Sequence, residues 1–177
     1  MAELSAAVLK QITATFERQR DLGLKALEQL TFEQLTQPLG DEDNSVAIIV
    51  KHLHGNMRSR WRDFLDTDGE KPDRQRDQEF VGAFASKEAI LELWTQGWNY
   101  VFTALRDINA EDLQRTVTIR SKPLSVLQAL LRQLDHYAYH VGQVVLLAKH
   151  FRGKSWRSLS ISKGKSATFN RRLGHEG

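Results

Sequence analysis

Four long segments of this chain carry apolar residues at helical intervals, and this repetition limits the fold more than any other feature. The segments span residues 4–37, 46–65, 86–105 and 124–151. Spacings of three and four residues place the apolar side chains of each segment along one face of an α-helix. Because such faces must be buried against one another, the pattern predicts an all-α four-helix bundle.

The connections between the predicted helices differ in length and character. Residues 37–40 break the first helix, Asn44 or Ser45 can cap the second, and residues 66–70 end it. Residues 71–85 then form a long, charge-dense connection, and a connection of this length in a compact domain is often functional.

A short β-hairpin fits the sequence immediately before the fourth helix. Residues 116–119 alternate between polar and apolar like a short strand, and residues 121–123 have the composition of a turn. We expect the fourth helix to begin at Leu124.

The length of 177 residues, of which 41% are hydrophobic, fits one domain with a tail. We expect residues 1–153 to form the bundle and residues 154–177 to form an irregular basic C-terminal tail. Residues 149–172 hold eight basic residues and no acidic one. Such a segment could bind nucleic acid, but it lacks a recognised fold and interleaved aromatic platforms, so we favour a tail packed along the acidic body. Contact with the body is predicted for four apolar residues of the tail, Trp156, Leu159, Ile161 and Phe169.

Composition also limits the location and the chemistry. No apolar run approaches the roughly 18 residues of a membrane helix, and residues 1–11 lack the pattern of a secretion signal, so we expect a cytoplasmic protein without a membrane anchor. The chain has no cysteine. Any bound metal must therefore use imidazole, carboxylate or water, and any thiol in a reaction must arrive with the substrate.

Two histidines, His136 and His140, lie four residues apart in the fourth predicted helix. This spacing puts both imidazoles on one helix face, as in many metal sites, and a third ligand must come from elsewhere. Because Tyr137 stands where the glutamate base of a His-Glu-x-x-His protease would be, that class is disfavoured. The candidates for the third ligand are His52, His54, His150 and His175.

Periodicity alone does not select among these candidates. His52 and His54 project about 200° apart around the second predicted helix, so one face cannot present both. His54 falls inside the apolar arc, whereas His52 lies at its edge, as His136 and His140 do on their own helix.

Three polar residues near the histidines are candidates for contact with a substrate or a ligand. Asn56 and Arg60 follow His52 by one and two turns, and a guanidinium suits a carboxylate or phosphate, although we favour a solvated helix face for both. Gln143, one turn after His140, can orient a ligand or act as a packing amide, and Gly142 would permit close helix approach.

Four stretches of the chain together resemble the DinB/YfiT-like metalloenzyme family, specifically a subfamily classified as a domain of unknown function. They are VKHLHGNMRSRW at residues 50–61, TDGEK at 67–71, HYAYHVGQ at 136–143 and WRSLSI at 156–161. The resemblance implies a four-helix bundle of distinctive connectivity and often a homodimer. It also implies a divalent metal held by one histidine of the second helix and two of the fourth. On that pattern His52, His136 and His140 are the ligands, and His54 is not.

The resemblance further implies an enzyme whose metal, most readily zinc or nickel, activates water or a low-molecular-weight thiol. Relatives include thiol-dependent S-transferases, a thiol-dependent isomerase and proteins called hydrolases, and imidazole ligands alone do not select the metal. Two alternatives stay open, a non-catalytic stress-related binding module with a structural or vestigial metal, and a metal-free helical dimer. An open coordination position would distinguish the enzyme from the module.

Overall fold

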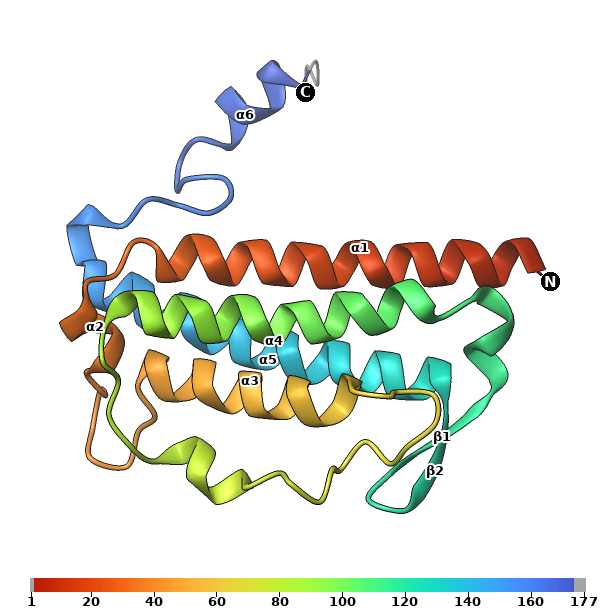
Figure 1. Cartoon of the computed structure of the whole chain (residues 1–177). Helices are drawn as coiled ribbons and strands as arrows, with labels where there is room; N and C mark the ends of the chain where they lie inside the picture. The colour runs from red at the N-terminus through yellow and green to blue at the C-terminus, as the bar shows by residue number, and fades with distance from the viewer. Residues whose placement is uncertain (1, 174–177) are drawn as a thin grey trace.

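The computed structural model describes residues 2–173 and is mostly helical, as the apolar periodicity predicts. Four long helices lie side by side along most of the molecule (Figure 1). Helix α1 packs against α4 and α5, and α3 packs against the same two helices from the other side. The four helices are α1 (Ala2–Leu27), α3 (Val46–Trp61), α4 (Lys87–Asp107) and α5 (Val126–Arg152).

The first predicted helix is divided into two helices in the structure. Helix α1 ends at Leu27, and a short helix, α2 (Phe32–Thr36), follows after a turn. Thr31 begins α2 with a capping box, in which its hydroxyl accepts from the Gln34 N–H while its own N–H donates to the Gln34 side chain. Apolar spacing continues across the turn because Leu30 is buried there, which explains why periodicity alone missed the break.

Serine hydroxyls begin two of the long helices at the predicted positions. Ser45 accepts a hydrogen bond from the Ile48 N–H, and Ser86 accepts one from the Ala89 N–H. Helix α3 ends earlier than predicted, at Trp61, because the chain turns through Asp63, whose φ is 46°. Phe64 still packs on the core beyond this turn, which prolonged the apolar pattern.

A hairpin precedes α5, formed by strands β1 (Thr116–Ile119) and β2 (Lys122–Ser125). The strands are antiparallel, with Ile119 opposite Lys122 at the turn. Arg120 and Ser121 make the turn with φ values of 54° and 59°, the backbone conformation of tight two-residue hairpin turns. The prediction of a helix start at Leu124 is wrong by two residues, because Leu124 lies within β2 and Ser125, the last residue of that strand, caps α5.

The C-terminal segment follows the body only in part. Half-buried Trp156 and Leu159 pack against the core as predicted. The Gln29 side chain donates a hydrogen bond to the carbonyl of Arg157 and accepts one from its backbone N–H. Ile161 and Phe169 are exposed, contrary to the prediction. The remaining elements are the 3-10 helices η1 (Arg76–Phe80), η2 (Ala110–Gln114) and η3 (Gly153–Ser155), and α6 (Ser166–Arg172), which extends away from the long helices in Figure 1.

The core between the long helices is rich in aromatic side chains. Phe16 of α1 meets Trp61 of α3 edge to face at a centroid distance of 5.5 Å, and Trp98 of α4 meets Tyr137 of α5 at 5.7 Å. The rings of Trp61, Trp98 and Tyr137 are buried, so these residues pack in the core. Of the helices in residues 2–173, none combines the length and apolar character needed to cross a membrane.

Candidate metal centre

Helices α3 and α5 bring three histidines together. His52, His136 and His140 each offer one ring nitrogen, and these three atoms lie within 4.8 Å of one another. The Nε2 atoms of His52 and His136 are 3.4 Å apart. These are the residues that the family resemblance implies as ligands, and they form a group that could hold a metal ion.

The remaining candidate histidines do not join this group. His54 lies on the α4 side of α3, near Tyr100, with a centroid distance of 6.3 Å between the rings. His150 is exposed near the end of α5. His175 lies outside the described residues. His52, at the edge of the apolar arc of its helix, therefore faces α5, whereas His54, inside the arc, faces α4.

Two of the three imidazoles are held at their second nitrogen. Nδ1 of His52 lies 2.8 Å from Oε2 of Glu79, and Nδ1 of His140 lies 2.8 Å from Oε1 of Gln143. Since these oxygens can only accept, each Nδ1 carries the proton and each Nε2 keeps its lone pair for a metal. Gln143 is thus in contact with His140, which is consistent with its predicted role of orienting a ligand.

Glu79, which holds His52, is itself fixed by Arg74. Arg74 donates from Nε to Oε1 at 2.8 Å and from Nη2 to Oε2 at 2.9 Å. The two side chains are only 4% and 7% exposed. Burial alone would raise the pKa of Glu79, but the hydrogen bonds from His52 and Arg74 outweigh it and lower the pKa. Glu79 is thus a carboxylate at neutral pH.

The 3-10 helix η1 also covers one face of His52. The ring of Phe80 stacks on the imidazole at a centroid distance of 4.8 Å, and the guanidinium of Arg76 lies 5.1 Å from the centre of the Phe80 ring. The connection between α3 and α4 therefore contributes to the site, as its length suggested. Sequence reasoning identified this connection but missed its individual residues Arg74, Glu79 and Phe80.

Gly55 is the sequence signal that could have pointed to this connection. A glycine inside a helix costs about 0.5–1 kcal/mol relative to alanine and so often marks a close approach. A Cβ atom at Gly55 would lie 2.4 Å from Oε1 of Glu79. Gly142, which we predicted at a close helix contact, has no atom within 4 Å of its Cβ position, so that prediction is wrong.

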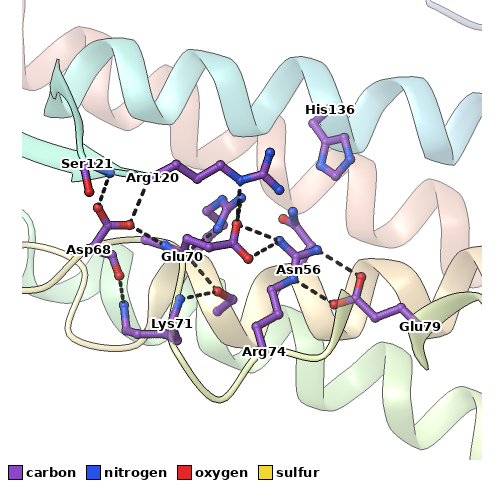
Figure 2. A network of polar contacts seen from close by, with 12 residues as sticks. Asn56, Asp68, Glu70, Lys71, Arg74, Glu79, Arg120, Ser121 and His136 are labelled. Carbon is purple, nitrogen blue, oxygen red and sulfur yellow. Dashed lines mark hydrogen bonds and ion pairs between the residues drawn. The ribbon is translucent and has the colours of Figure 1, made fainter. Parts of the chain in front are cut away.

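A second polar network ties the hairpin to the site (Figure 2). Asp68 accepts from the backbone N–H groups of Arg120 and Ser121 at 2.9 and 2.7 Å. Burial raises the pKa of Asp68, but hydrogen bonds from the backbone of Glu70, Ser121 and Arg120 outweigh it and lower the pKa to about 2. Residues 66–70, which were predicted to end the second helix, instead lie beyond its end and fix the hairpin turn through Asp68.

A cavity of about 700 Å³ opens at the three histidines. Asn56 and Arg60 line it and are buried, so our preference for a solvated helix face is wrong for both. Asn56 accepts from the hydroxyl of Tyr137 at 3.1 Å, and Arg60 donates to Glu70 at 2.9 Å. The cavity lining is His52, Asn56, Arg60, Arg74, Arg76, Phe80, Arg120, Arg132, Gln133, Asp135, His136, Tyr139 and His140.

The imidazoles of His136 and His140 are neutral at physiological pH. Burial, together with the nearby His140 and His52, lowers the pKa of His136 from 6.5 to about 3. Burial also lowers the pKa of His140, against the opposing effect of its hydrogen bond to Gln143. Neutral imidazole is the form that binds metals, so these residues are ready to act as ligands.

We expect acid to destabilise the metal-free protein through His136. Its pKa is lower in the folded state than the ordinary value of 6.5, so the unfolded chain binds more protons as the pH falls from 6.5 toward 3. The free energy of unfolding then falls with a slope of up to about 1.4 kcal/mol per pH unit. The free energy of unfolding can be measured by urea titration at several pH values between 7 and about 5, where carboxylates are still ionised. It should depend less steeply on pH in His136→Asn than in the wild type. Equal slopes would contradict the lowered pKa.

The structure thus defines a mostly helical protein with a candidate three-histidine metal site backed by buried ion pairs. The chain belongs to the family described as "Protein of unknown function (DUF1572)", whose family model matches residues 3–165. The match includes all three histidines and the connection that carries Glu79. No curated protein matches the chain.

Proposed function

We propose that this protein is a metal-dependent enzyme of the DinB type, in which His52, His136 and His140 hold a divalent ion. The observation that carries the proposal is the convergence of three imidazole nitrogens within 4.8 Å beside a cavity of about 700 Å³. The anchoring of His52 by Glu79 and of His140 by Gln143 supports it, because metal-binding histidines commonly have such partners.

The donor set fits zinc or nickel, which imidazole binds well. When bound, a divalent ion with three protein ligands keeps a position open for water or substrate and lowers the pKa of water or of a thiol. The protein itself supplies orientation: Glu79 and Gln143 hold two rings, and Phe80 covers one face of His52. We propose hydrolysis or thiol transfer on a small molecule, with the thiol supplied by a low-molecular-weight cosubstrate since the chain has no cysteine.

The family resemblance supports further parts of the proposal. The four long helices would form a bundle of DinB connectivity within residues 1–153, and residues 154–177 would form a separate basic tail. A homodimer located in the cytoplasm would follow from the same resemblance.

We expect purified wild-type protein, after reconstitution, to contain about one equivalent of metal per chain. His136→Ala and His140→Ala should lose most of it, because each removes one of three ligands. His150→Ala is the matched control, since His150 is exposed on the same helix outside the group. Elemental analysis of the four proteins measures the result. A wild-type protein without metal would leave the metal-free helical dimer as the interpretation.

The binding-module alternative differs from the enzyme in the fourth coordination position. An enzyme requires a position that exchanges solvent, whereas a structural site is closed by a fourth protein ligand. Cobalt-substituted protein should therefore change its visible spectrum when a small thiol or azide is added. An unchanged spectrum at full cobalt occupancy would favour the module.

A further inference from the structure

The lining of the cavity beside the three histidines is strongly basic. Asp135 is the only acidic residue that lines it within residues 2–173, and the carboxylates of Glu70 and Glu79 lie behind the lining. Five guanidinium groups face one lining carboxylate and the two carboxylates of Glu70 and Glu79, so positive charge is in excess even before any metal is bound. The five arginines of the lining are Arg60, Arg74, Arg76, Arg120 and Arg132.

Two of these arginines are engaged by internal partners, whereas the others keep guanidinium nitrogens that can bind a ligand. Arg60 and Arg74 are buried and bound to Glu70 and Glu79. Arg120 also contacts Glu70, through Nε at 3.0 Å, but its side chain is 56% exposed. Its two terminal nitrogens have no hydrogen-bond partner in the described part of the chain. Figure 2 shows this guanidinium extending from the hairpin turn toward His136.

Glu70 holds Arg120 in a defined orientation, which distinguishes it from an ordinary surface arginine. Glu70 is itself fixed by Arg60 at 2.9 Å and by Arg74 at 3.3 Å. On the other side, the backbone N–H of Arg120 donates to Asp68. An arginine fixed at its backbone and at Nε presents two parallel N–H groups, the arrangement that binds carboxylate or phosphate in a bidentate manner.

Two buried polar atoms without protein partners belong to residues of the same lining. Oε1 of Gln133 and Nε of Arg60 have no hydrogen-bond partner among residues 2–173. Their residues are only 2% and 4% exposed. Buried polar atoms are nearly always paired in native proteins, so atoms of this kind beside a cavity point to a polar ligand.

We propose that the substrate of the metal site is a small anion, whose carboxylate or phosphate group is bound by Arg120 with Arg132 while its reacting group faces the three histidines. The inference rests on the proposed function for the identity of the site but not for the anion binding itself. Oε1 of Gln133 would accept a hydrogen bond from a hydroxyl or amide group elsewhere on the ligand, and Phe80 and Tyr139 supply apolar walls to the cavity. The arginines thus select anionic substrates, and the three histidines mark where the reacting group of the substrate lies.

The test uses inorganic phosphate as the probe and metal-free protein at constant ionic strength. The Nε–H resonances of the arginines, followed by NMR, should shift saturably on titration of the wild type. Arg120→Gln should raise the dissociation constant by about tenfold or more, and Arg120→Lys, which keeps the charge but not the paired N–H groups, by less. Arg18→Gln is the control, because Arg18 is exposed on α1 and does not line the cavity.

Arg132→Gln provides a second variant in case the loss of the Glu70 contact alters the hairpin. Arg132 is exposed and has no ion pair within residues 2–173, and its replacement should weaken phosphate binding without changing the thermal melt. Repeating the titration with succinate distinguishes the two anion classes by which probe binds more tightly. The proposal is overturned if neither anion saturates the wild type, or if Arg120→Gln and Arg18→Gln bind equally well.

Metal content is measured separately on the same preparations, so the two proposals can fail independently. Phosphate binding without metal binding would retain the anion site and remove the enzyme proposal. Metal binding without anion binding would retain the metal site and remove the anion site.

Discussion

Replacement of Glu79 by alanine is expected to lower the free energy of unfolding by about 3–5 kcal/mol, as is typical when one partner of a buried ion pair is removed. The guanidinium of Arg74, only 4% exposed, would lose its bidentate partner. His52 would also lose the acceptor of its Nδ1 proton. Metal affinity should then fall by about 10- to 100-fold. Urea denaturation in chelator and competitive metal titration measure the two effects.

Asp77→Ala is the matched control for this change. Asp77 lies in the same 3-10 helix, but its side chain is 97% exposed, so its loss should alter stability by no more than about 0.5 kcal/mol. Glu79→Gln should have an intermediate effect, since it keeps the shape and one acceptor but not the charge. If Glu79→Ala were as stable as Asp77→Ala, the buried network would not contribute as described.

Two glycine-to-alanine changes are expected to have opposite signs. In Gly55→Ala the new Cβ would lie 2.4 Å from Oε1 of Glu79. The Glu79 carboxylate cannot move away without breaking its hydrogen bonds to Arg74 and His52. We expect a loss of about 1–3 kcal/mol from this overpacking. In Gly142→Ala the Cβ meets nothing within 4 Å, and the helix should gain about 0.5–1 kcal/mol.

Thermal unfolding of the two variants, followed by circular dichroism, gives the signs directly. Metal titration adds an independent measure, because Gly55→Ala disturbs the partner of His52 whereas Gly142→Ala should leave metal affinity unchanged. A stabilised Gly55→Ala protein with normal metal affinity would show that Glu79 is not held rigidly against α3.

The helices were predictable because their signals are local. Apolar residues three and four apart mark the buried faces, and Ser45 and Ser86 cap their helices within one turn. The pair His136 and His140 is equally local. The third histidine could not be identified from local spacing, because both His52 and His54 occur on α3. The family resemblance rather than periodicity favoured His52.

The rest of the site depends on contacts between distant segments, which single-sequence patterns do not reveal. Glu79 reaches His52 from a connection whose residues have no regular spacing, and Asp68 binds a hairpin turn about 50 residues away. The burial of Arg60 was missed for the same reason, since its partner Glu70 is presented by a loop. Polar residues with buried partners look like surface residues in the sequence.

The distance along the chain between the site histidines has a consequence for when metal is acquired. His52 and His136 are separated by 84 residues and His140 follows one turn later, so a ribosome must synthesise more than half of α5 before all three imidazoles exist. Closing such a large loop costs conformational entropy, which the docking of α5 against α1 and α3 helps to offset. If the three histidines hold a metal as proposed, tight uptake would follow the docking of α5, and the occupied fraction in a cell would report how many chains have reached that state.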